Sequence, residues 1–173
     1  MPDIIRNGRV EADDWDESAL LTLAEWKARR HESMPEGTRV GVRLEPADDP
    51  AEIASDLDRL QLVAINFPRF ADGRGYSCAV LLRTRYGYRG ELRAIGDVGR
   101  DQLFCLKRSG FDAFALAPHR DPHAAAASLG DFSLRYQGSV DDPLPLFRKR
   151  LAMAPRGMHF ASTAGAIPEE NLP

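Results

Sequence analysis

The sequence predicts an α/β domain built on a mainly parallel β-sheet. Short apolar runs alternate with segments of helical periodicity through four consecutive βα units, and the connections between them are short. Two of the predicted helices start with an Asp-Pro pair, which caps a helix and opens its first turn. We favour a doubly wound open sheet. Half of a (βα)8-type barrel, which could close by forming a homodimer, is the alternative.

The N-terminal elements are predicted from turn and capping residues. Residues 3–10 predict a strand that turns at Asn7-Gly8, a pair that favours tight turns. Apolar residues at helical spacing after Ser18 predict a helix capped by that serine. The alternating run 39–44 predicts a strand, and Asp49-Pro50 starts the next helix.

The remaining elements repeat the same alternation. Residues 62–67 are continuously apolar, which is typical of a strand buried on both sides. The later elements are a helix at about 75–85, a strand at 91–95, a helix at 101–108 ended by Gly110, a strand at 111–116 and a helix capped by Asp121. Each strand is therefore followed by a helix.

Regularity fades after Gly130. Residues 132–136 predict an edge strand, and residues 144–150 predict a docked turn with a basic end. The domain is expected to span residues 1–150. Residues 151–173 are rich in Pro, Gly, Ala and Ser and lack periodicity, so they predict a loosely held tail.

Composition is that of an ordinary globular protein. Hydrophobic residues make up 43% of the 173-residue chain and charged residues 28%, which favours one domain with a real core. No apolar run approaches the roughly 20 residues that cross a bilayer, and the N-terminus lacks the layout of a signal peptide. Two cysteines cannot form a disulfide framework or a four-thiolate cluster. We therefore expect a reduced, cytoplasmic protein that contacts no membrane.

Charge is unevenly distributed along the chain. Residues 69–108 contain nine Lys or Arg and four Asp or Glu, a net charge of +5, so the rest of the chain carries −8. Nucleic-acid binding calls for a basic surplus over the whole domain, and the net charge here is −3. A small oxyanion or an acidic protein surface fits a local patch better. Solvated helix faces are the structural alternative.

The predicted binding surface lies where the parallel strands end, because helix N-termini gather at that edge. The rule selects four loops, 45–49, 67–77, 96–102 and 117–123. In the second loop Gly73 and Gly75 flank Arg74 at a helix start, an arrangement suited to an anion. The anion-binding candidates are Arg74, Gly75, Tyr76, Ser77 and Arg100. In the alternative, Asp72 caps the helix and Arg74 pairs with a nearby acid.

Four further polar residues are expected to support this surface. They are Asp72, Asp97, Asp101 and Gln102. Asp97 or Asp101 could act as a base or join Asp72 around a hard cation, but capping or a salt bridge to Arg74 is favoured. His119 and His123 lack a third ligand, so we expect no metal site. The sequence also has no dinucleotide fingerprint, and we expect no bound cofactor.

The motifs around this turn resemble those of a known bacterial family, the domain of unknown function 934. The resemblance is carried by residues 67–77 (FPRFADGRGYS), 81–88 (LLRTRYGY), 90–97 (GELRAIGD) and 100–104 (RDQLF). Residues 132–136 (FSLRY) and 142–147 (DPLPLF) resemble the family's closing segment. The resemblance spans roughly residues 10–150.

The resemblance implies a role in sulfur assimilation. Members of the family are typically encoded beside assimilatory sulfite reductase and are often labelled sulfite-reduction oxidoreductases. No catalytic residue is settled for the family, so none is carried over. We expect an accessory protein that contacts sulfite reductase or another sulfate-assimilation protein. A small enzyme acting on an anionic metabolite at the same loops and a non-catalytic scaffold are the alternatives.

Overall fold

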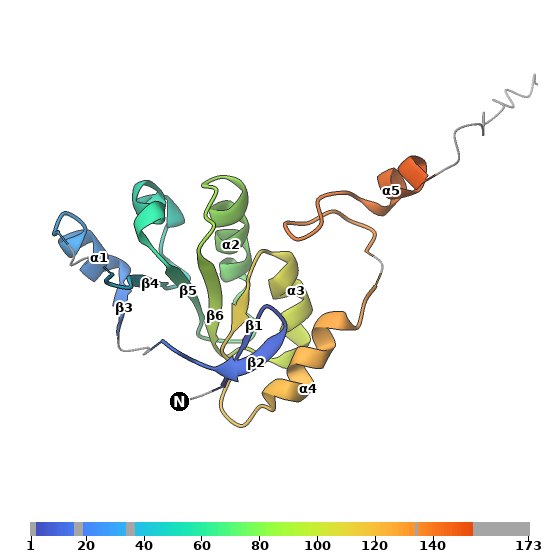
Figure 1. Ribbon diagram of the computed structural model, residues 1–173, viewed down its shortest axis with the longest axis horizontal. Helices are drawn as coiled ribbons and strands as arrows, with labels where there is room; N and C mark the ends of the chain where they lie inside the picture. Colours follow the sequence, from blue (N-terminus) through green and yellow to red (C-terminus); the bar gives the residue numbers. More distant parts are fainter. Residues whose placement is uncertain (1–2, 16–18, 34–36, 134, 154–173) are drawn as a thin grey trace, which may run out of the picture.

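Five parallel strands and an antiparallel hairpin form one seven-stranded sheet in the order β2-β1-β7-β6-β5-β4-β3 (Figure 1). The computed structural model describes residues 3–15, 19–33, 37–133 and 135–153. The strands are β1 Asp3–Arg6, β2 Arg9–Ala12, β3 Leu20–Thr22, β4 Gly41–Leu44, β5 Leu62–Phe67, β6 Glu91–Gly96 and β7 Ala113–Phe114. The helices, with 3₁₀ helices written η, are α1 Leu23–Arg29, η2 Pro50–Arg59, α2 Arg74–Thr84, η3 Arg100–Gln102, α3 Leu103–Arg108, α4 Pro122–Ala127, η4 Ser128–Gly130 and α5 Leu146–Met153.

The α/β class and the mainly parallel sheet are confirmed, and strand order corrects the favoured topology. From β3 to β7 each strand pairs in parallel with the next one along the chain. A doubly wound sheet reverses its strand order partway, and these five strands do not. The order of these five strands is therefore that of half a (βα)8 barrel. Right-handed crossovers that all run in one direction place their helices on one face of the sheet.

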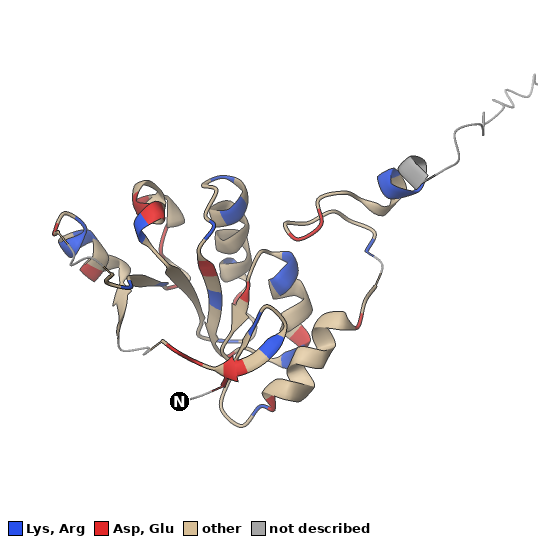
Figure 2. Ribbon diagram, in the orientation of Figure 1, with Lys and Arg blue, Asp and Glu red and all other residues tan. Residues whose placement is uncertain are grey.

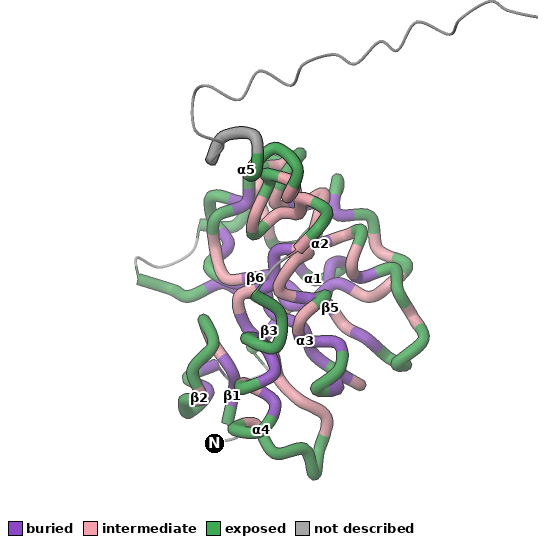
Figure 3. The backbone as a smooth tube through the Cα atoms, turned by 90° about the vertical axis from the view of Figure 1, so that its right-hand side faces the viewer, coloured by how far each residue is buried: buried purple, intermediate pink, exposed green. Residues whose placement is uncertain are grey.

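The main core lies between the sheet and these crossover helices. Leu23, Ile53, Ala79 and Leu103, from successive helical segments, belong to one buried cluster with the strand residues Val42, Leu44, Val63, Ile65, Phe67, Leu92 and Ala94. A smaller cluster on the opposite face contains strand residues and Trp15 from the linker after β2. In Figure 3 the buried backbone follows the strands, whereas the loops at the sheet edges are more exposed. None of the helices in the described ranges is long and apolar enough to span a membrane.

The Asp-Pro helix starts are confirmed at atomic detail. Asp49 Oδ1 accepts a hydrogen bond from the amide of Ala51 at 2.9 Å, and Asp121 Oδ1 accepts one from His123 at the same distance. In each case the carboxylate satisfies an amide that has no partner within the helix. The strand predicted at residues 62–67 forms with those bounds. Gly110 follows α3 with a φ of +105°, as expected of a glycine past a helix end.

The N-terminal region differs from the prediction in two ways. Residues 3–12 form a hairpin of two strands around Asn7-Gly8, both with positive φ, rather than a single strand. The helix predicted after Ser18 starts only at Leu23, because Leu20–Thr22 pairs with β4 as a strand. Thr22 caps α1 in a reciprocal arrangement with Glu25. Ser18 itself lies outside the described residues.

The predicted edge strand at residues 132–136 is wrong for the residues that the structure describes there. β1 pairs with β7, so the N-terminal hairpin, and not residues 132–136, extends the sheet beyond β7. The basic segment predicted as a docked turn instead contains α5. Residues 154–173 of the predicted tail lie outside the described residues.

Candidate functional site

The predicted binding loops meet at the carboxyl edge of the sheet. Phe67, the last residue of β5, pairs with Gly96, the last residue of β6, so the loops after these strands leave the sheet side by side. A cavity of about 290 Å³ separates the loop after β4 from the start of α2. Its wall includes Arg74, Gly75 and Ser77 of the predicted anion site.

Asp72 occupies the start of α2. Its Oδ1 accepts hydrogen bonds from the backbone amide of Arg74 at 3.2 Å and from the Nε of the same residue at 3.0 Å. Its Oδ2 lies 2.7 Å from Nη2 of Arg74. The guanidinium lowers the pKa of the Asp72 carboxyl, and the carboxylate in turn raises the pKa of Arg74. The position expected for a bound oxyanion therefore faces a carboxylate of the chain itself.

Asp97 and Gln102 hold the backbone of Phe70, and Asp97 does not pair with Arg74. Asp97 Oδ2 accepts a hydrogen bond from the Phe70 amide at 3.1 Å. Gln102 Nε2 donates to the Phe70 carbonyl at 3.3 Å, while its Oε1 accepts from the Gly99 amide at 2.9 Å. Both backbone polar groups of Phe70 are thus fixed, and its side chain remains 56% exposed.

Gly75 and Tyr76 serve the packing of α2 against the sheet. A Cβ at Gly75 would lie 2.6 Å from the ring of Phe67 and 3.0 Å from Ile65, so only glycine lets the helix approach this closely. Tyr76 packs edge-on against Phe67 with ring centroids 5.5 Å apart, and burial raises its pKa. Ser77 is exposed.

Arg100 and Asp101 line a different cavity from Arg74. Their neighbours there include Phe104 and Phe132, whose ring centroids are 4.8 Å apart. Nη2 of Arg100 lies 3.9 Å from Asp131, a weak and exposed pairing. The predicted site residues therefore form three separate groups. One is Asp72 with Arg74, one surrounds Phe70, and one contains Arg100.

The cavity beside Arg74 has an acidic wall. Glu45, Asp48 and Asp49 line it opposite α2, which disfavours an anionic ligand. Cys78 also lines it, and burial together with Asp48 and Asp49 raises the pKa of its thiol to about 12. No three His, Cys, Asp or Glu side chains within the described ranges are grouped to hold a metal ion.

Sequence reasoning missed a polar cluster on the face of the sheet away from the helices. Asn66 Nδ2 donates to Glu45 Oε2 at 2.7 Å, and Arg43 Nε lies 3.0 Å from Glu45 Oε1. A signal was available, because Asn66 is the only polar residue in the apolar run 62–67. Strand alternation places it on the same face as Leu62 and Ala64.

The basic segment 69–108 does not form one patch. Arg93 pairs with Asp13, Arg83 with Asp112, and Arg108 approaches Asp141. Within the described part of the chain, the basic residues of this segment with no acidic partner within 4.0 Å are Arg69, Arg85, Arg89 and Lys107. Apart from Arg74, the basic residues of α2 and α3 lie in the last turn of each helix, at the end opposite the predicted site (Figure 2).

Fold and site together define a singly wound α/β domain that presents an aromatic turn at its carboxyl edge. The family model described as bacterial protein of unknown function (DUF934) matches residues 41–147, and the chain belongs to this family. The match includes β4 through β7 and the turn that carries Phe70. Neither the curated proteins nor the solved structures contain a match to the chain.

Proposed function

We propose that this chain is a cytoplasmic accessory protein of assimilatory sulfite reduction that docks onto sulfite reductase or a related enzyme through the turn around Phe70. The observation that carries the proposal is the fixed backbone of this exposed phenylalanine. Asp97 and Gln102 bind its amide and carbonyl, so the ring is held outward at 56% exposure. A large apolar side chain held in water without a packing role is typical of a contact residue.

Charge near Phe70 supports an acidic partner surface. Arg69 is exposed and has no acidic partner within 4.0 Å among the described residues, and Arg74, paired with Asp72, is also exposed. Aromatic and arginine side chains are the types enriched at the centres of protein interfaces. The pairing of Asp72 with Arg74 favours docking over capture of a free oxyanion, because the guanidinium is already engaged.

The direct test measures binding of the full chain to sulfite reductase holoenzyme from the same bacterium. We expect Phe70→Ala to raise the dissociation constant by about tenfold or more, the effect of removing an aromatic contact residue. Arg69→Gln should lower the association rate and its salt dependence. Phe147→Ala is the matched control, because Phe147 is 51% exposed but lies in α5.

Three outcomes would contradict this proposal. The first is no association together with no effect of the protein on sulfite-reductase turnover. The second is saturable binding of sulfite or sulfate that Arg74→Ala abolishes without loss of folding, which would support a small enzyme for an anionic metabolite instead. Equal binding by Phe70→Ala and by the unmodified chain would exclude this turn as the contact.

A further inference from the structure

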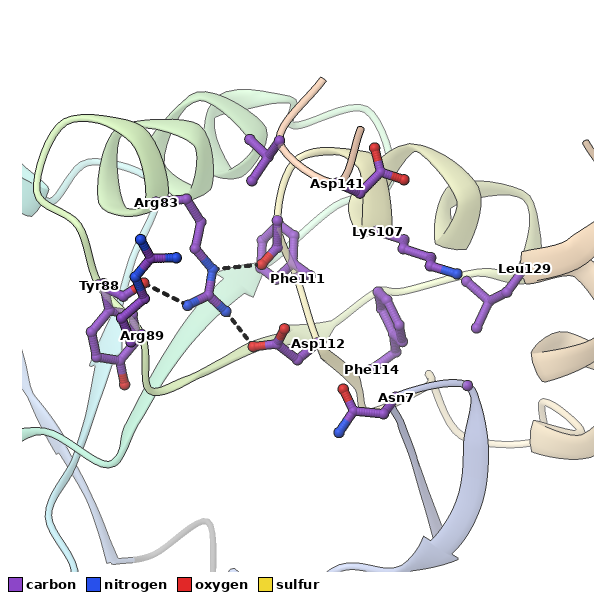
Figure 4. Close-up of a pocket in the computed structure, with 13 residues that line it drawn as sticks. Asn7, Arg83, Tyr88, Arg89, Lys107, Phe111, Asp112, Phe114, Leu129 and Asp141 are labelled. Atoms are coloured by element: carbon purple, nitrogen blue, oxygen red, sulfur yellow. Dashed lines mark hydrogen bonds and ion pairs between the residues drawn. The ribbon is translucent and has the colours of Figure 1, made fainter. Parts of the chain in front are cut away.

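A larger cavity lies at the opposite, amino-terminal edge of the sheet. Its volume is about 470 Å³, within the range of small-molecule sites (Figure 4). Five parts of the chain line it: the β1–β2 turn, the end of α2 with the loop after it, the end of α3 with β7, η4, and a segment near residue 140. The site proposed above contributes none of its lining residues.

Arg83 forms a rigid wall of this cavity. Its Nε donates to the Gly110 carbonyl at 2.9 Å, and its Nη1 donates to the carbonyls of Tyr88 and Gly90 at 2.8 and 2.9 Å. Its Nη2 pairs with Asp112. The ion pair neutralises the charges of Arg83 and Asp112, and the bonds to the three carbonyls hold the Arg83 side chain in place at the cavity wall.

The second acid of the cavity is also compensated. Asp141 pairs with Arg135 and lies 4.0 Å from Arg108. Its charge is therefore balanced by side chains outside the cavity lining. The lining keeps a surplus of positive charge.

That surplus resides on Arg89 and Lys107. Neither has an acidic partner within 4.0 Å in the part of the chain that the structure describes. Figure 4 shows them on opposite sides of the Arg83–Asp112 pair, with Lys107 near Leu129 and Phe114. Arg89 also lines two neighbouring cavities, of about 300 and 470 Å³, so it is shared by all three.

Apolar side chains complete the cavity beside these cations. Phe111, Phe114 and Leu129, which are almost fully buried, line it together with Val140. An apolar floor with a few charged groups at its rim is the usual construction of a site for an organic ligand. Inorganic anions would leave the apolar floor uncovered.

We propose that this amino-edge cavity binds a small organic anion, with its apolar body on Phe114 and Leu129 and its charge compensated by Lys107 and Arg89. This inference does not depend on docking to sulfite reductase, because the two sites lie at opposite edges of the sheet and share no residue.

The test titrates the isotope-labelled full chain with naphthalene sulfonate, followed by amide chemical shifts and by calorimetry. Naphthalenemethanol is the neutral probe with the same ring, and inorganic sulfate is the anion without an apolar body. We expect saturable binding of the sulfonate at least about fivefold tighter than of either comparison probe. The shifts should cluster at residues 7–8, 107–114 and 129.

Charge variants locate the site. Lys107→Gln and Arg89→Gln should each weaken sulfonate binding by about fivefold. Arg85→Gln is the matched control, because Arg85 is an exposed arginine at the end of α2 that does not line the cavity. Binding unchanged in both cavity variants, equal weakening in the control, or shifts confined to the carboxyl edge would overturn the proposal. None of these results bears on binding to sulfite reductase.

Discussion

Nη1 of Arg93 lies 2.7 Å from Oδ2 of Asp13, and both side chains are at least 97% buried. Arg93 belongs to β6, whereas Asp13 lies in the linker after the N-terminal hairpin. Nε of Arg93 also donates to Glu91 at 2.9 Å, and Glu91 accepts from Nε of Arg6 in β1 at 2.8 Å. These charged groups bind the linker to the face of the sheet opposite the main core and link β1 to β6.

Removal of the Asp13 charge should destabilise the protein strongly. Asp13→Asn keeps the size of the side chain but leaves Arg93 buried with only Glu91 as a partner. We expect the free energy of unfolding to fall by about 3 kcal/mol, as for other broken buried pairs. Urea denaturation followed by tryptophan fluorescence measures the change.

The neighbouring Asp14 supplies the control for that variant. Its side chain is 55% exposed, so Asp14→Asn should cost less than about 1 kcal/mol although it also contacts Arg6 and Arg39. Equal effects of the two substitutions would show that burial of the Arg93 pair is not what stabilises the linker.

Replacement of Arg83, even by lysine, should lower the stability of the protein. A lysine ammonium cannot reproduce the planar fork that reaches the carbonyls of Tyr88, Gly90 and Gly110 together with Asp112. We expect Arg83→Lys to lower the free energy of unfolding by about 2 kcal/mol. Arg85→Lys, two residues later and exposed, should change it by less than about 0.5 kcal/mol. Urea denaturation curves of the two variants measure these changes. An Arg83→Lys variant as stable as the unmodified chain would show that a single donor is sufficient at this position.

The two glycines of the Phe70 turn should respond differently to alanine. Gly75→Ala places a methyl group against the ring of Phe67 and should cost about 1–3 kcal/mol of stability. Gly73 has no atom within 4 Å of an added Cβ and a φ of −86°, so Gly73→Ala should cost less than about 1 kcal/mol. Thermal unfolding compares them. The reverse order would indicate that Gly73, rather than Gly75, sets the approach of α2.

The two cysteines should differ in reactivity toward a disulfide reagent at pH 8. The pKa of Cys78 is raised to about 12, which disfavours the thiolate, so only about one molecule in ten thousand carries it at that pH. Cys105 is exposed. We expect one thiol to react rapidly in the native protein, and the second to react far more slowly there than in denaturant. Modification of Cys78 should accelerate as pH rises, and a fast thiol in Cys105→Ser would contradict this assignment.

Local signals in the sequence predicted most of the fold correctly. The apolar run 62–67, typical of a buried strand, forms one, and Asp49 and Asp121 cap their helices by binding amides two residues further along the chain. Leu20–Thr22 was mistaken for helix because its strand character comes from pairing with β4, which no local pattern reveals. The order of the strands in the sheet likewise depends on which strands pair. The short loops of the sequence do not predict that pairing.

The position of the candidate turn could be predicted from the sequence, but the ion-pair partners of the charged residues could not. The turn around Phe70 does lie at the carboxyl edge, beside the loop after β6. Its ion pairs could not be anticipated, because acids far along the chain neutralise much of the basic segment. Asp13 reaches Arg93 and Asp112 reaches Arg83 only in the folded sheet.

The pairing of β1 with β7 also determines when the protein can finish folding. Ile5 pairs with Phe114, so the hairpin is synthesised more than a hundred residues before its partner strand. During translation the parallel strands can assemble one after another, while residues 3–12 must wait. Until the hairpin docks, β7 is an open edge with unpaired backbone groups, the feature through which partly folded chains associate. The hairpin, although made before β7, can therefore cover the edge of β7 only after the parallel strands have been made.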